Sequence, residues 1–148
     1  RLIDSVSARL EQVAFNSDVA ISAEGDSVII QGVSRLLDEM VYNLASNAIR
    51  YNRPGGSVRL SCGKNADGHA FVRVADTGIG IAPEEQGKVF ERFYRVDKSR
   101  SKARGGTGLG LAIVKHAAVF HHAEIDLQSE LGVGTTITVT FPENTIEL

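Results

Sequence analysis

Four polar side chains share one stripe of a helix predicted over residues 33–51. Glu39, Asn43, Asn47 and Arg50 stand at i, i+4, i+8 and i+11, beside the apolar face of that helix. Asparagine is a mediocre helix former, so two of them one turn apart require an explanation. Their carbonyl oxygens are hard ligands of the kind that Mg²⁺ prefers, and Arg50 adds positive charge. The stripe is compatible with a metal–phosphate site and equally with a solvated helix face.

A short loop with two glycines, Asp76-Thr77-Gly78-Ile79-Gly80, directly follows a predicted strand. An aspartate at a strand end can accept a hydrogen bond from an exocyclic amine such as that of adenine. Glycines allow the backbone to approach a flat ligand closely. The pattern D-x-G-x-G is weak by itself, because ordinary loops also contain it.

A second glycine-rich segment, residues 105–111, opens the third long predicted helix. Such a turn presents free backbone N–H groups and the positive end of the helix dipole to an anion. The segment lacks the Gly-Lys-Ser/Thr ending of a Walker loop, and it does not follow a strand as a dinucleotide-binding turn does. A helix cap or a hinge explains one or two of its glycines, but not four in six positions.

Between the two loops lies a basic segment with two phenylalanines. Six of the 16 Lys and Arg residues fall between Arg92 and Arg104. The spacing of Phe90 and Phe93 would anchor a short helix on the core, and arginine suits bidentate contacts to phosphate. Taken alone, however, the segment is better explained as a solvated basic loop.

The elements that would position these residues follow from hydrophobic periodicity. The sequence predicts helices at 3–16, 33–51, 83–90 and 109–120, and strands at 19–21, 27–30, 57–62, 70–75, 124–129 and 135–141. A turn at 24–26 separates the first two strands, and the first helix carries Ile3, Val6, Leu10 and Val13 at helical spacing. This mixed order is typical of an α+β domain with helices on one face of a sheet. The loop-rich stretch 76–107 is unusually long and indicates a functional lid or disorder.

Composition excludes several classes of protein. The 148 residues suffice for one domain, and the net charge of −2 offers no bulk positive charge for nucleic acid or an anionic membrane. No apolar run approaches the ~20 residues that span a bilayer. The chain opens at Arg1 without a start Met or a signal peptide, so a piece of a longer protein is expected. A single cysteine, Cys62, leaves no internal disulfide and fits a reducing cytosol.

Together, N-x-x-x-N on a helix, D-x-G-x-G, F-x-x-F and G-x-G-x-G resemble the catalytic and ATP-binding domain of bacterial sensor histidine kinases, over about residues 35–141. The superfamily of that domain includes gyrase, the MutL mismatch-repair protein and the Hsp-type ATPase chaperone. Residues 43–52, 90–101 and 105–116 are especially similar to the phosphate-regulon sensor type. The resemblance implies the Bergerat ATP-binding fold. This is a two-layer α/β sandwich with a mixed, mostly antiparallel sheet, three main helices on one face and a mobile ATP lid at about 81–106.

The resemblance also implies a role for each matching residue. Asn47 is expected to coordinate Mg²⁺, with Asn43 assisting near the phosphates. Asp76 is expected to recognise the adenine amine, with Gly78 and Gly80 giving it room.

Other positions match the family as well. Arg50 and Tyr51 match the basic and aromatic positions beside the nucleotide, and Thr135 matches a hydroxyl that joins the adenine contact through water. Arg95 matches the phosphate-reaching arginine of the lid, and with Asn43 it is expected to act in catalysis. The complete set of expected ATP contacts is Asn43, Asn47, Arg50, Tyr51, Asp76, Gly78, Gly80, Ile81, Phe90, Arg95, Lys98, Gly106, Thr107, Gly108, Leu109, Gly110 and Thr135.

Two missing groups limit the expected chemistry. ATPases of this superfamily carry a glutamate, which activates water, where this chain has Asn43, so water attack should be poor. Glu39 lies a further turn back and is not expected to substitute. The phosphorylated histidine of the family stands in an H-[DE]-x-x-[ST]-P motif, which none of the four histidines matches. His116, His121 and His122 are expected to be surface or helix-end residues.

The function expected is therefore one half of a kinase. The domain would bind Mg-ATP and donate the γ-phosphoryl group to a histidine on its own separate dimerisation and phosphoacceptor domain, which then serves a response regulator receiver domain. An isolated monomer is expected, cytoplasmic, with no nucleic acid and no direct membrane contact, at the cytoplasmic end of a membrane-anchored sensor. The alternatives are an ATPase or an anti-sigma-type serine kinase of the same superfamily, or a degenerate interaction module without enzymatic activity.

Overall fold

The computed structural model describes residues 2–26, 28, 30, 32–90 and 110–142. In chain order the elements are α1 (Leu2–Asn16), β1 (Ala20–Gly25), α2 (Ser34–Arg50), β2 (Ser57–Lys64), β3 (Ala70–Asp76), α3 (Pro83–Gln86), α5 (Gly110–Phe120), β4 (Glu124–Glu130) and β5 (Gly134–Thr140). The five strands form one sheet in the order β1-β2-β3-β5-β4. Strands β1 and β2 are parallel, and the other neighbours are antiparallel.

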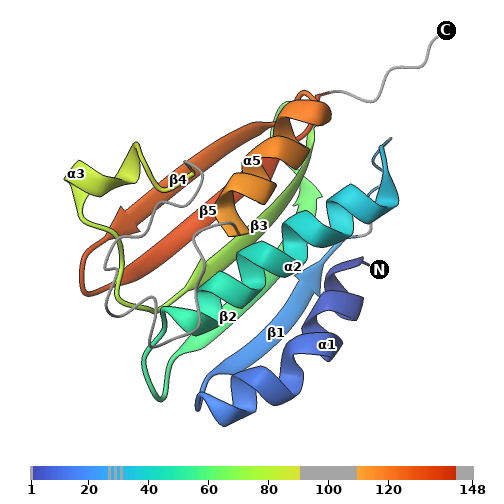
Figure 1. Ribbon diagram of the computed structural model, residues 1–148. Helices are drawn as coiled ribbons and strands as arrows, with labels where there is room; N and C mark the ends of the chain where they lie inside the picture. Colours follow the sequence, from blue (N-terminus) through green and yellow to red (C-terminus); the bar gives the residue numbers. More distant parts are fainter. Residues whose placement is uncertain (1, 27, 29, 31, 91–109, 143–148) are drawn as a thin grey trace, which may run out of the picture.

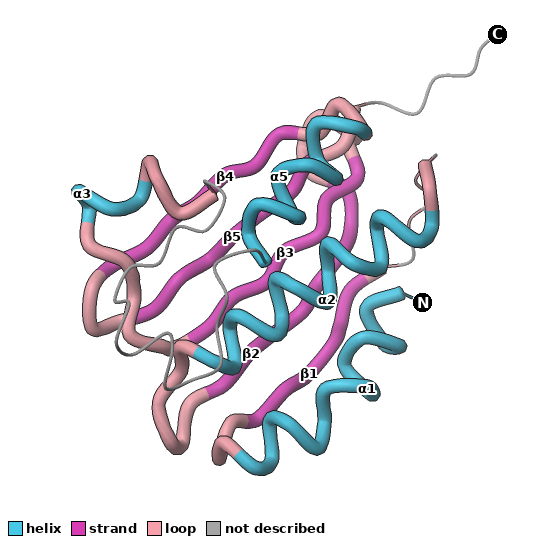
Figure 2. The backbone as a smooth tube through the Cα atoms, in the orientation of Figure 1, coloured by secondary structure: helices cyan, strands magenta, loops and turns pink. Residues whose placement is uncertain are grey.

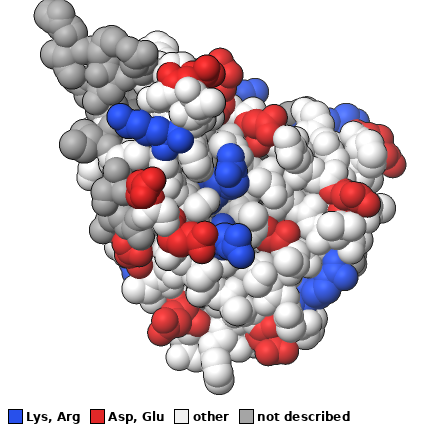
Figure 3. Space-filling model, turned by 180° about the vertical axis from the view of Figure 1, so that it is seen from behind, with Lys and Arg blue, Asp and Glu red and all other residues white. Residues whose placement is uncertain are grey.

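Helices α1, α2 and α5 lie side by side across one face of this sheet, with α2 in the middle (Figures 1 and 2). The other face is open, and positively and negatively charged side chains are interspersed on it (Figure 3). This arrangement confirms the predicted α+β class, with two layers and helices on one face. Among the described helices, none combines the length and apolar composition needed to cross a bilayer.

The core lies between the two layers. Apolar and polar residues alternate along β2, β3 and β5, so that each strand sends one set of side chains towards the helices. Val58, Leu60 and Val139 from the sheet and Met40 and Val41 from α2 are fully buried in this core. Burying each such side chain contributes roughly 1.5–3 kcal/mol. Because α2 lies between α1 and α5, its position is fixed on three sides.

The helical spacing of apolar residues in α1 does not match its buried face at every position. Ile3, Val6 and Leu10 are buried, but Val13 is 47% exposed and Ala14 lies in the core at 1%. From Leu10, a step of four residues stays closer to the core-facing stripe than a step of three does. The smaller side chain of Ala14 therefore faces the core, and the larger one of Val13 does not.

The prediction of two short strands before α2 was also wrong. A single strand, β1, runs through Glu24 and Gly25, where a turn was expected, because its parallel pairing with β2 continues to Gly25 opposite Cys62. Gly25 has φ +116°, and a Cβ there would lie 2.2 Å from the carbonyl oxygen of Cys62. Of the second predicted strand, residues 28 and 30 lie in no strand, and 27 and 29 lie outside the described residues.

The beginning of the predicted lid is well attached to the rest of the domain. Helix α3 starts with Pro83 at a position where the missing N–H costs nothing. It ends at Gln86 and not at residue 90, because the Lys88 N–H bonds to the carbonyl of Glu85 in a tighter turn. Val89 is buried and Phe90 packs against the core. The rest of the predicted lid, residues 91–106, lies outside the described residues.

Candidate functional site

Three chain segments meet at the end of the sheet where β3 finishes. They are the loop after α2, the loop after β3 and the turn between β4 and β5 (Figure 1). The Ile79 N–H donates to the carbonyl of Tyr51 at 3.1 Å, and the Gly132 N–H donates to the carbonyl of Ile79 at 2.8 Å. The backbone itself therefore ties the three segments together around Asp76.

Asp76 is held by one of its two carboxylate oxygens. The last pair of the β3–β5 register sets it opposite Thr135. Its Oδ1 accepts hydrogen bonds from the N–H of Gly78 at 2.8 Å and from the N–H of Thr135 at 3.2 Å. For Oδ2, no hydrogen bond is found within the described part of the chain. The second oxygen is thus placed to accept a bond from a ligand donor.

The electrostatic setting of Asp76 combines two opposing effects. Burial raises the pKa of Asp76 above its ordinary value, because the charged form loses hydration. The hydrogen bonds from Gly78 and Thr135 act in the other direction, because they stabilise the charged form, but burial dominates.

Both glycines of this loop are required by neighbouring protein backbone. A Cβ at Gly78 would lie 2.5 Å from the carbonyl oxygen of Tyr51. Gly80 has φ +75°, and a Cβ there would lie 2.2 Å from the carbonyl oxygen of Glu130. We expected these glycines to make room for a ligand, and the structure shows that they also make room for the adjoining segments.

Two polar residues after α2, which the sequence analysis did not select, organise this end of the sheet. Asn52 is 5% exposed, its Nδ2 donates to the carbonyl of Ser57 at 3.0 Å, and its Oδ1 accepts from the Arg53 N–H at 2.8 Å. The Arg53 guanidinium donates to the carbonyls of Gly78 at 2.6 Å and Gly132 at 2.8 Å. In the sequence, the available signal was an asparagine directly after a predicted helix, because asparagine commonly bonds to backbone in turns.

A serine that the sequence analysis did not select connects Thr135 to the loop after β3. Ser129 Oγ accepts a bond from the Ile81 N–H at 2.7 Å, and it lies 2.7 Å from Thr135 Oγ1. Thr135 is buried at 9% exposure. The threonine predicted to join the adenine contact therefore lies beside Asp76, with its hydroxyl bonded to Ser129.

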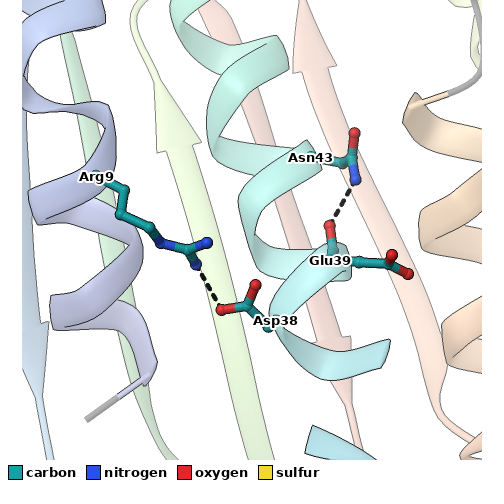
Figure 4. A network of polar contacts seen from close by, with 4 residues as sticks. All are labelled: Arg9, Asp38, Glu39 and Asn43. Atoms are coloured by element: carbon teal, nitrogen blue, oxygen red, sulfur yellow. Dashed lines mark hydrogen bonds and ion pairs between the residues drawn. The ribbon is translucent and has the colours of Figure 1, made fainter. Parts of the chain in front are cut away.

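The polar stripe of α2 is half-buried and partly bonded to itself. Asn43 Nδ2 donates to the carbonyl of Glu39 at 2.7 Å, and Figure 4 shows its oxygen pointing away from that contact. Asn47 Oδ1 accepts a bond from the Arg50 guanidinium at 2.9 Å. The predicted metal ligand thus already has a cation beside it. Glu39 is exposed and lies 3.8 Å from Arg35 in an i,i+4 ion pair.

A contact with α1 fixes α2 below this stripe. Arg9 of α1 is bonded to Asp38 of α2 at 2.5 Å, as Figure 4 shows, and the Arg9 guanidinium also lies 5.2 Å from the centroid of the Tyr42 ring. The ion pair is part-exposed, so it adds little stability on its own. It nevertheless joins the first helix directly to the one that carries the asparagines.

Not every predicted contact residue can be compared with the structure. Arg95, Lys98, Gly106, Thr107, Gly108 and Leu109 lie outside the described residues. Gly110 begins α5, which packs against α2, so the glycine-rich segment ends beside the helix of the asparagines. No cluster of three or more His, Cys, Asp or Glu side chains that could hold a metal ion occurs in the described ranges.

His121 lies directly after the end of α5, as one of the two expectations for it had stated, but it is buried inside the domain and not on the surface. It is 7% exposed, its Nε2 accepts the Val33 N–H at 3.0 Å, and its Nδ1 lies 2.7 Å from the carbonyl of Ala117. The ring therefore joins the end of α5 to the start of α2. His116 and His122 are exposed as predicted. The sequence gives no sign that one of two consecutive histidines after a helix will contact the start of a second helix.

The fold, together with an aspartate at the end of a strand and two glycines in the loop that follows it, defines the class of ATP-binding domain that the sequence predicted. A family model described as histidine kinase-, DNA gyrase B- and HSP90-like ATPase matches residues 32–145. The chain belongs to this family, and it is an ATP-binding domain.

The similar proteins are sensor histidine kinases. The sensor-like histidine kinase SenX3 of Mycolicibacterium smegmatis is 44% identical over 143 residues, which cover 96% of this chain and 37% of that protein. The structure of the mycobacterial sensor histidine kinase MprB matches with a TM-score of 0.81 at 31% identity, covering 95% of this chain and 93% of that one. Full-length ShkA in complex with AMPPNP matches with a TM-score of 0.81 at 28% identity, covering 95% of this chain and 29% of that one. The predicted resemblance is confirmed, and the chain spans little more than a third of the length of SenX3.

Proposed function

We propose that this domain holds Mg-ATP between Asp76 and the polar stripe of α2, and that the whole protein transfers the γ-phosphoryl group to a histidine of a separate phosphoacceptor domain. The observation that carries the proposal is the asymmetric hydrogen bonding of the Asp76 carboxylate, whose Oδ1 accepts bonds from two backbone N–H groups. The remaining oxygen can accept the exocyclic amine of adenine. The ATPase family match and the kinase relatives support this assignment.

The phosphates would then extend towards α2 and α5. Asn43 and Asn47 contribute amide oxygens, and Arg50 contributes a positive charge from the same helix face. Mg²⁺ is usually held by few protein groups together with phosphates and water, which fits a stripe with amide oxygens and no acidic cluster. Bound Mg²⁺ would neutralise phosphate charge. The N-terminus of α5 would contribute its dipole.

The remaining predicted contacts complete the proposed site. Tyr51 would lie beside the nucleotide and Thr135 would support the adenine contact. Further expected ATP contacts are Gly78, Gly80, Ile81, Phe90, Lys98, Gly106, Thr107, Gly108, Leu109 and Gly110, and Arg95 is the proposed catalytic arginine.

The proposed reaction needs positioning and charge neutralisation more than covalent help from the protein. A nitrogen of the acceptor imidazole would form a bond to the γ-phosphorus while the bond to the bridging oxygen of ADP breaks. Water would be a poor substitute, because Asn43 offers no carboxylate base and Glu39 is exposed and paired with Arg35. The domain would therefore keep ATP largely intact until the acceptor arrives.

The wider setting of the domain follows from its relatives. We expect an adjoining dimerisation and phosphoacceptor domain, a response regulator as the next phosphate acceptor, and a membrane-anchored full-length sensor with this domain on the cytoplasmic side. By itself the domain would be a monomer that contacts neither the membrane nor nucleic acid.

Calorimetry with a non-hydrolysable ATP analogue tests this proposal. We expect binding with Mg²⁺ present, and binding about tenfold weaker after chelation, because the metal screens the phosphates. Asn47→Ala should bind alike with and without Mg²⁺, whereas Asn16→Ala, an exposed asparagine of α1, should keep the full difference. No binding by the wild-type domain, or rapid steady ATP hydrolysis by it, would contradict the proposal.

A further inference from the structure

Arg53 connects two loops that both touch Asp76. Its Nη2 donates to the carbonyl of Gly78 in the loop after β3, at 2.6 Å, and to the carbonyl of Gly132 in the β4–β5 turn, at 2.8 Å. Hydrogen bonds from a charged donor are stronger than those between neutral groups. One side chain thus joins two segments that lie 54 residues apart in the chain, from 78 to 132.

The same two segments are joined a second time through Asp76. Gly78 and Thr135, which lies in β5 three residues after Gly132, both donate their N–H groups to Oδ1 of that carboxylate. Between these two connections, the Gly132 N–H bonds to the carbonyl of Ile79 at 2.8 Å. Arg53 and Asp76 therefore close opposite sides of one ring of polar contacts.

The backbone that carries Arg53 is itself held in place. Asn52 is buried and bonded to Ser57, and the carbonyl of Tyr51 accepts the Ile79 N–H. Arg53 is exposed, and its bond to Gly132 is open to water while its bond to Gly78 is part-buried, so the two bonds are modest in strength. Their consequence is geometric: they restrain the peptide between Gly78 and Ile79, whose N–H is already used by Tyr51.

We propose that Arg53 is a positioning residue that sets the preference of the site for adenine over other bases. It acts through the loop after β3, which presents the Gly78 N–H to Asp76, and through the turn that precedes Thr135 in β5, and it is not proposed to touch the nucleotide. This inference rests on the proposed adenine contact of Asp76. In the proposed site, the contacts to ribose and phosphate do not involve these loops. The part of the nucleotide affinity that comes from ribose and phosphate should therefore survive the loss of Arg53.

The test compares the affinities of ADP and IDP, which differ at the position where adenine carries its amine. Calorimetry should show that the wild-type domain prefers ADP. In Arg53→Met, which keeps most of the aliphatic stem, the ratio of the two affinities should fall by about tenfold, the scale expected for losing one or two net hydrogen bonds. Arg59→Met is the matched control, because Arg59 is exposed on neighbouring β2 and paired only at 3.9 Å with Glu24.

The outcomes separate the two proposals. A wild-type domain with no preference for ADP contradicts the proposed function itself. A wild-type preference that persists in Arg53→Met contradicts only the role of Arg53. The thermal unfolding midpoint is measured in parallel, and a changed ratio at an unchanged midpoint excludes a merely structural effect. If Arg53→Met is unfolded, Arg53→Gln decides, because it is too short to reach both carbonyls, and an unchanged ratio there would refute the inference.

Discussion

The two carboxylate oxygens of Asp76 have different surroundings, and this difference underlies the proposed site. Oδ1 accepts two backbone N–H bonds, which fix the plane of the carboxylate. The other oxygen then points where a ligand can use it. A partly buried charge of this kind costs stability and is kept where it has a function.

The free energy of unfolding of the domain should depend on pH because of the partly buried charge of Asp76. Burial raises the pKa of Asp76 above 3.8, so the folded protein holds that proton more tightly than the unfolded chain. Above the folded-state pKa the charge is fully present and its cost is largest, and protonation removes that cost as the pH falls. The free energy of unfolding, measured in urea from about pH 4 to pH 7, should therefore decrease in the wild type relative to Asp76→Asn as the pH rises. A constant difference between the two proteins, or one of opposite slope, would contradict this.

Asn47 illustrates what residue types alone cannot specify. Its position on the stripe was predictable from helical spacing, but its hydrogen bond with Arg50 was not. An oxygen that already accepts from a guanidinium has a second lone pair, so the proposed metal would share it or displace Arg50 towards the phosphates. The assignment of Asn47 as the metal ligand stays a proposal.

At the scale of elements, contacts from α1, from α5 and from the loops after α2 and β3 hold α2 in position. The start of α2 is held by His121 at the end of α5, and its first half by the bond between Arg9 of α1 and Asp38. Its end passes directly into Tyr51 and Asn52, which contact the loop after β3 and the start of β2. The asparagines therefore stand on a helix that is anchored at both ends.

His121 should be more important for stability than its sequence context suggests. His121→Leu keeps a similar volume but leaves the part-buried Val33 N–H without its acceptor. We expect the free energy of unfolding to fall by about 1 kcal/mol, the low end of the cost of an unsatisfied donor, because water can partly reach this N–H. His116→Leu, at an exposed position of the same helix, should change it little. Urea denaturation of both variants measures this, and equal effects would show that the Val33 contact is unimportant.

Most elements were predictable, and the errors at β1 and His121 have a common physical cause. The stripe of α2 and the alternation of β2, β3 and β5 are set by local periodicity, which a sequence displays directly. The extent of β1 depends on pairing with β2, and the burial of His121 on contact with α2. Both are decided by partners distant in the chain. Arg53 and Ser129 escaped notice for the same reason, since their contacts cross between loops.

At the scale of the whole molecule, the proposed function gives this chain one half of a reaction. Helices cover one face of the sheet, and the candidate site lies at one end of the sheet, beside the end of α2 (Figure 1). None of the described histidines combines exposure with the acceptor motif, and the chain covers 37% of SenX3. A phosphate donor that depends on another domain for its acceptor fits these observations.

The most direct measurement of the central claim is the affinity of Asp76→Asn for a non-hydrolysable ATP analogue. Oδ1 must remain an acceptor for Gly78 and Thr135, so the new amide would turn its NH₂ towards the adenine amine, donor against donor. We predict a loss of at least about a hundredfold in affinity, in a domain that stays folded. Asp126→Asn, at an exposed position of β4, should bind as the wild type does. Binding by Asp76→Asn within about twofold of the wild type, well below the cost of an unpaired donor, would contradict the account.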